Sequence, residues 1–110
     1  MTIAAAPPSP LRLRCSVPFC TRTRGRWKGE PPISADMSWI CGDHWRLVPV
    51  YMRRRHSRLL RLYTKRYGRA GHWDYPPGSP DRIGALRLAR VLKRAWGQCE
   101  RAAIEAAVGL

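Results

Sequence analysis

The chain has no asparagine, a single phenylalanine and only seven acidic residues among its 110 positions. Against those seven acids stand 21 lysines and arginines, which give a formal net charge of +14. So few acids exclude a surface that is neutralised by its own side chains, and such a protein needs a polyanion or counter-ions nearby. Nucleic acid is therefore the first expected partner, and an anionic membrane surface is the second.

Arginine makes up all but three of the 21 cationic residues. Together with the missing asparagine and the abundant alanine, this preference is what a GC-rich genome produces by mutational bias alone. The preference for arginine over lysine therefore carries no functional weight, whereas the net charge does.

Long apolar runs are also missing from the sequence. No stretch approaches the roughly 20 apolar residues that are needed to span a bilayer. The start, MTIAAAPPSPLRLR, has no basic segment ahead of an apolar run, as a signal peptide would have. The sequence therefore predicts a cytoplasmic protein without a membrane span, and four cysteines in a reducing compartment favour metal binding over disulfides.

The expected fold is a small α+β domain that is stabilised by zinc, because a chain of this length builds only a thin core and often adds a metal. Residues 1–11 are predicted to be a disordered tail and residues 12–68 a zinc-binding unit that ends in a basic helix. Residues 69–80 are expected to form a loop, and residues 81–110 a C-terminal helix that packs on the basic helix.

Local signals divide the zinc-binding unit further. The segment TRTRGRWK predicts a hairpin centred on Gly25, and MSWI a short strand that returns to it. Asp43 is expected to cap a first helical turn. Pro49 is tolerated only near a helix start, so the main helix is expected from about Val50 to Tyr67, with Gly68 ending it. One apolar stripe at helical spacing would face the core: Met52, His56, Leu59, Leu60, Tyr63 and Tyr67.

Three cysteines and a histidine carry the strongest motif, C-x4-C-x20-C-x2-H, formed by Cys15, Cys20, Cys41 and His44. A tight turn can present the first pair, and the first turn of a helix the second, because residues i and i+3 project from the same side. Four thiolate and imidazole ligands suit a closed tetrahedral zinc site. The sequence therefore predicts one structural zinc ion with no open position for water.

This arrangement resembles the treble-clef zinc finger, in which a knuckle and a hairpin are followed by a helix whose first turn completes the site. The resemblance covers about Arg14 to Tyr67. More narrowly, SWICGDHWRLVP followed by a basic helix looks like small uncharacterised zinc-finger proteins encoded by bacteriophages and prophages of GC-rich bacteria. This resemblance implies, by position, that Cys15, Cys20, Cys41 and His44 are the zinc ligands. The usual knuckle is C-x2-C followed by glycine, whereas here it is C-x4-C followed by Thr21.

Alternatives to this zinc site stay open at this point. The cysteines would be buried free thiols in one alternative, and a Cys15–Cys20 disulfide is another. His72, in a loop beside a tryptophan, and His56, on the helix stripe, are the other histidines that would replace His44. Cys99 falls on the apolar face of the last helix and is expected to be a small buried hydrophobe.

Two groups of basic residues are candidates for phosphate contact. Nine lysines and arginines, and no acid, lie after His44 up to and including Arg69. Six of them are expected on the main helix opposite its apolar stripe: Arg53, Arg54, Arg58, Arg61, Lys65 and Arg66. A second basic edge on the ribbon would consist of Arg22, Arg24, Arg26 and Lys28, with Trp27 between them. Cations mixed with aromatic rings suit phosphate contacts plus stacking on bases; the alternative is a solvated basic face without a partner.

The leading hypothesis is thus a non-enzymatic, zinc-binding protein that binds DNA or RNA. One alternative is an adaptor or inhibitor that binds a host protein, anchored by Trp39, Trp45, Trp73 and Trp96. The other is a metal-dependent nuclease of the HNH type, which DHWRLVP (residues 43–49) superficially resembles. That family needs an asparagine and further histidines around its catalytic metal, and this chain has no asparagine.

Overall fold

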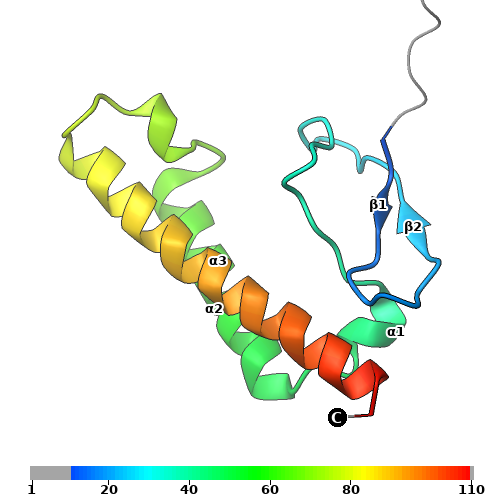
Figure 1. Ribbon diagram of the computed structural model, residues 1–110. Coiled ribbons are helices and arrows are strands. Elements are labelled where there is room, and N and C mark those ends of the chain that lie inside the picture. The colour runs from blue at the N-terminus through cyan, green and yellow to red at the C-terminus, as the bar shows by residue number, and fades with distance from the viewer. Residues whose placement is uncertain (1–10, 110) are drawn as a thin grey trace, which may run out of the picture.

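The computed structural model describes residues 11–109, so residues 1–10 of the expected tail lie outside the described residues. Residues 11–49, called the ribbon unit below, lead into two long helices, α2 (Val50–Tyr67) and α3 (Pro80–Ala107). These two helices pack along each other as an antiparallel hairpin (Figure 1). The ribbon unit lies beside the carboxyl-terminal half of α3, where α1 (Gly42–Trp45) contacts that helix. The predicted α+β class is therefore confirmed.

The ribbon consists of β1 (Leu13–Arg14) and β2 (Thr23–Arg24), which pair in antiparallel register. The hairpin predicted around Gly25 is wrong, because the chain reverses earlier, through residues 15–22. The reversal closes with a hydrogen bond of 3.0 Å from the Cys20 backbone N–H to the Val17 carbonyl oxygen. Burial of Val17, which is 2% exposed, thus outweighs the turn preference of glycine.

The segment MSWI returns to this ribbon, but only through one bridge. Trp39 pairs with Cys15 in parallel orientation, and the Ser16 N–H donates to the Trp39 carbonyl oxygen at 2.8 Å. The expected strand is thereby reduced to a single pairing.

The helical part follows the predicted boundaries closely. α2 begins at Val50, directly after Pro49, and ends at Tyr67, before Gly68 with its φ of +62°. Asp43 does not cap α1, because Cys41 occupies the N-cap position. Asp43 instead lies in the first turn of α1 and pairs with Arg22 at 2.6 Å.

The apolar stripe of α2 packs against α3, although Leu60 at its margin is 46% exposed. Between the two helices, the connecting segment includes a short 3-10 helix, η1 (His72–Asp74). The Ser79 hydroxyl then caps α3 by accepting a hydrogen bond of 3.2 Å from the Arg82 backbone N–H. No helix among residues 11–109 is long and apolar enough to cross a membrane.

The main core lies where the ribbon unit meets α3. It contains Cys15, Val17, Cys20, Ile40, Cys41 and Val48 from the first half of the chain, together with Cys99 and Ala103 of α3. Two side-chain hydrogen bonds also join the two parts: the Ser16 hydroxyl donates to Glu100 at 2.6 Å, and the Trp96 indole donates to the Ser38 hydroxyl at 2.7 Å.

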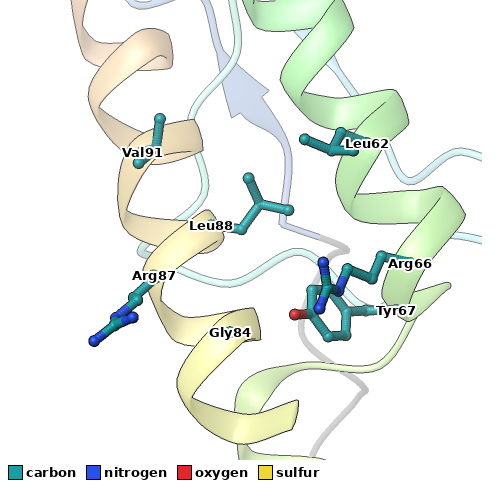
Figure 2. A pocket seen from close by; sticks show the side chains of 7 residues that line it. All are labelled: Leu62, Arg66, Tyr67, Gly84, Arg87, Leu88 and Val91. Atoms are coloured by element: carbon teal, nitrogen blue, oxygen red, sulfur yellow. The ribbon is translucent and has the colours of Figure 1, made fainter. Parts of the chain in front are cut away.

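At the other end of the hairpin, α3 approaches α2 closely at Gly84 (Figure 2). A Cβ atom at Gly84 would collide with the hydroxyl of Tyr67, whereas one at Gly97 of the same helix would meet nothing within 4 Å. Gly84→Ala is therefore expected to lower the free energy of unfolding by about 1–3 kcal/mol through overpacking. Gly97→Ala should raise it by about 0.5–1 kcal/mol, because alanine favours helix. Urea unfolding of both variants measures the contrast; equal effects would contradict the close approach.

Candidate metal centre

The four residues of the cysteine–histidine motif come together in one cluster. Their ligand atoms all lie within 4.8 Å of one another, although Cys15 and His44 are 29 positions apart. The Cys20 and Cys41 sulfurs are separated by 3.8 Å, and Nδ1 of His44 lies 3.6 Å from the Cys15 sulfur and 3.1 Å from the Cys41 sulfur. The group could hold one metal ion.

These separations fit a single tetrahedral centre. Metal–sulfur bonds of about 2.3 Å and a metal–nitrogen bond of about 2.0 Å, at tetrahedral angles, place two sulfurs about 3.8 Å apart and a sulfur and a nitrogen about 3.5 Å apart. The Cys20–Cys41 and Cys15–His44 separations, 3.8 and 3.6 Å, are close to these values, whereas the Cys41–His44 separation of 3.1 Å is shorter. The four donors are thus close enough to share one metal ion, and two of their separations match a tetrahedral centre.

Local structure explains how each pair is presented. Cys15 follows β1 directly, and the turn closed at Val17 brings Cys20 back beside it. Cys41 and His44 lie at the start of α1, one helical turn apart, so that they face the same side. The Cys41 backbone N–H donates to the Cys15 sulfur at 3.3 Å, which ties the turn to the helix start.

Burial and hydrogen bonding act in opposite directions on the thiols. Burial raises the pKa of Cys15. Burial also pushes the pKa of Cys41 upward, but hydrogen bonds with the backbone and ring of His44 and with the Cys15 and Cys20 thiols outweigh it and lower this pKa to about 7. The Cys41 thiol is thus ionised more readily than the Cys15 thiol.

Metal affinity is expected to fall on acidification, because thiolates are the ligands and each protonated thiol must lose its proton on binding. Protons compete at Cys41 below its pKa of about 7, and at Cys15 already at higher pH. Between about pH 8 and about pH 6 the affinity for Zn²⁺ should drop by more than about tenfold per pH unit. Titration against a chromophoric chelator at each pH measures the slope, and a pH-independent affinity would contradict thiolate ligation.

Position excludes the alternative disulfide and the two alternative histidines. Cys15 and Cys20 are free cysteines, so they do not form the alternative disulfide. His56 lies away from the cluster, against the ring of Trp96 at a centroid distance of 5.1 Å, and His72 is in η1 beside Trp73. Cys99 is fully buried in the adjoining core and is not among the four clustered ligands, as expected from its place on α3.

The basic residues of the ribbon are more engaged than the sequence suggests. Arg24 forms a bidentate pair with Glu30, with nitrogen–oxygen distances of 2.8 and 3.0 Å. Its side chain is only 10% exposed, so it is not an open phosphate ligand. Nε of Arg26 donates to the Glu30 carbonyl oxygen at 2.6 Å, and Arg22 pairs with Asp43. Sequence reasoning missed the role of Glu30, the acid that follows this basic stretch two residues after Lys28.

The residues of α2 that were predicted to contact phosphate divide into two groups. Arg53 lies close to the start of the helix, where its Nε donates to the Val48 carbonyl oxygen at 3.0 Å. The others predicted to bind phosphate are exposed on the helix: Arg54, Arg58, Arg61, Lys65 and Arg66. Four of them, Arg54, Arg58, Arg61 and Lys65, follow one another at spacings of four, three and four and are called the arginine stripe below.

Comparisons with models of protein families, with curated proteins and with solved structures found no match for this chain.

Proposed function

We propose that the chain is a zinc-stabilised, non-enzymatic protein that binds nucleic acid through the arginine stripe of α2. Three thiolates and one imidazole are the ligand set preferred by zinc among the common divalent ions, and a tetrahedral arrangement suits it. The separations between the ligand atoms support this choice. The knuckle between the strands and the ligands on α1 support a treble-clef-like arrangement.

A structural role for the ion follows from the number of protein ligands. Four protein donors fill a tetrahedral sphere and leave no position for a reacting water. The ion would join the turn that holds Cys15 and Cys20 to the start of α1, and thereby fix the ribbon against the helical part. This arrangement supports a scaffold for binding rather than the nuclease alternative.

The observation that carries the nucleic-acid assignment is the arginine stripe. Its members recur at helical spacing and are exposed, and α2 contains no acidic residue. Because like charges at these spacings repel, the stripe destabilises the isolated helix slightly, and a polyanion would relieve that repulsion. The 18 residues of α2 extend for about 27 Å, enough to follow phosphates along a groove.

Binding of a labelled oligonucleotide across a salt series tests this proposal. Phosphate contacts release counter-ions, so the logarithm of the association constant should fall linearly with the logarithm of the salt concentration. Weak binding with a flat salt dependence would contradict the proposal. Retention of a host protein from nuclease-treated lysate, together with such a flat dependence, would favour the adaptor alternative.

A further inference from the structure

A cleft lined by aromatic rings lies between the ribbon unit and the helices. Its volume is about 380 Å³, within the range of sites that hold small ligands. Four tryptophans and a histidine contribute to its lining: Trp27, Trp39, Trp45, Trp96 and His56. The sequence suggested three of these tryptophans as anchors for a partner protein, but it did not show that they lie near Trp27. The four tryptophans come from separate segments of the sequence, so only the tertiary structure places them in one cleft.

The inner wall of the cleft is well ordered by its own contacts. The rings of Trp45 and Trp96 stack at a centroid distance of 5.8 Å and an interplanar angle of 28°. The hydrogen bond from Trp96 to Ser38 fixes the Trp96 ring from the other side. His56 adjoins both rings, and burial lowers its pKa, which favours its uncharged form at neutral pH. The inner wall is therefore aromatic and without charge.

The outer wall is Trp27, which is 57% exposed although its ring is held in place. The Arg24 guanidinium lies 3.7 Å from the centroid of this ring, and the pair with Glu30 holds that guanidinium in turn. An exposed indole with one face supported by a fixed cation is a preorganised stacking surface. Its neighbours in the sequence, Arg26 and Lys28, are both exposed cations.

We propose that this cleft binds an unpaired base of a single-stranded nucleic acid, with Trp27 as a stacking surface and Arg26 and Lys28 beside it for the flanking phosphates. The inference rests on the proposed nucleic-acid function and adds the class of substrate. Aromatic rings stack on any base because every base has a π-face. A net charge of +14 and the arginine in the cleft disfavour the other common ligand of aromatic sites, an organic cation.

The test compares two labelled oligomers of equal length, an oligothymidylate and an oligomer built only of abasic residues. Both carry the same phosphates, so a protein that contacts phosphates alone should bind them equally. Stacking of one base should favour the oligothymidylate by between about fivefold and about 150-fold. Trp27→Leu should remove this preference while leaving the salt dependence of binding unchanged, because no cation is lost.

Trp73→Leu is the matched control, since Trp73 is 70% exposed but lies in η1, at the far end of the helical hairpin (Figure 1). This variant should retain the preference for the oligothymidylate. Equal binding of both oligomers by the unaltered protein, with a clear salt dependence, would overturn the cleft assignment and leave the proposed function standing. Binding of neither oligomer would overturn the cleft assignment, and it would overturn the proposed function as well if a labelled duplex also failed to bind. Competition by tetramethylammonium would assign the cleft to a cation instead.

Discussion

Replacing Cys41 by serine is expected to abolish stoichiometric zinc binding and to unfold the ribbon unit. Cys41 is 1% exposed, its sulfur lies within 3.8 Å of the Cys20 sulfur, and its backbone N–H donates to Cys15. Structural zinc contributes an apparent free energy of about 10–16 kcal/mol in small metal-binding units. A whole domain of this size is stable by only about 5–15 kcal/mol, so the ribbon unit should not survive the loss of the ion.

Metal analysis of the purified protein and thermal unfolding with and without a chelator measure this effect. The unaltered chain should carry one zinc ion, and chelation should reproduce the unfolding seen in the Cys41→Ser variant. Replacing zinc by Co²⁺ should give the absorption of a tetrahedral centre with three thiolates.

Cys99→Ala provides the control, because Cys99 is equally buried in the same core but lies outside the cluster. It should lose some stability and keep its zinc. Loss of zinc from both variants to the same degree would mean that core packing, and not ligation, explains the effect of Cys41→Ser. Full zinc content in Cys41→Ser would refute the site.

Removing positive charges from the arginine stripe is expected to reduce nucleic-acid affinity more than removing the same number of charges from α3. In the variant, Arg54, Arg58 and Arg61 are all replaced by glutamine, which keeps helix propensity while removing three exposed charges. Each lost phosphate contact should reduce the slope of log K against log salt by about 0.9 on duplex DNA and about 0.7 on a single strand, so three lost contacts should reduce it by about 2.7 or about 2.1. Fluorescence anisotropy between about 50 mM and 200 mM salt measures the slope.

A second variant tests whether the location of the lost charges on α2, and not only the change in net charge, causes the loss of affinity. Arg87, Arg90 and Arg94 are exposed on α3, and their replacement by glutamine changes the charge by the same amount. This control should reduce the slope by much less than the variant on α2. Equal reductions would indicate that only the overall field matters, and an unchanged slope in the α2 variant would remove α2 from the interface.

Strong local signals made the helical part and the cluster predictable from the sequence. Pro49 restricts where α2 can begin and Gly68 where it ends, and both act through backbone geometry that does not depend on the rest of the fold. The ligand set was predictable for a similar reason. The i, i+3 spacing of Cys41 and His44 places them on one side of a helical turn, whatever lies around it.

The features that were missed depend on contacts between distant segments. Gly25 has the conformational freedom of a turn residue, but the burial of Val17 decided where the chain reverses. Arg24 looks like any other cation of its stretch until its pairing with Glu30 and its position over Trp27 are known. The aromatic cleft likewise exists only after α3 has brought Trp96 beside Trp45. Such properties are set by tertiary structure, which spacing along the chain does not encode.

The packing of α3 against the core that contains the thiol cluster has a consequence for the order of events during translation. Cys99 and Ala103 are fully buried in the core that contains all three cysteines of the cluster, yet they follow His44 by more than 50 positions. A nascent chain therefore contains the four candidate ligands before the part of α3 that completes their core has been made. Under the proposed function, Zn²⁺ could therefore bind these thiols before α3 has packed against them.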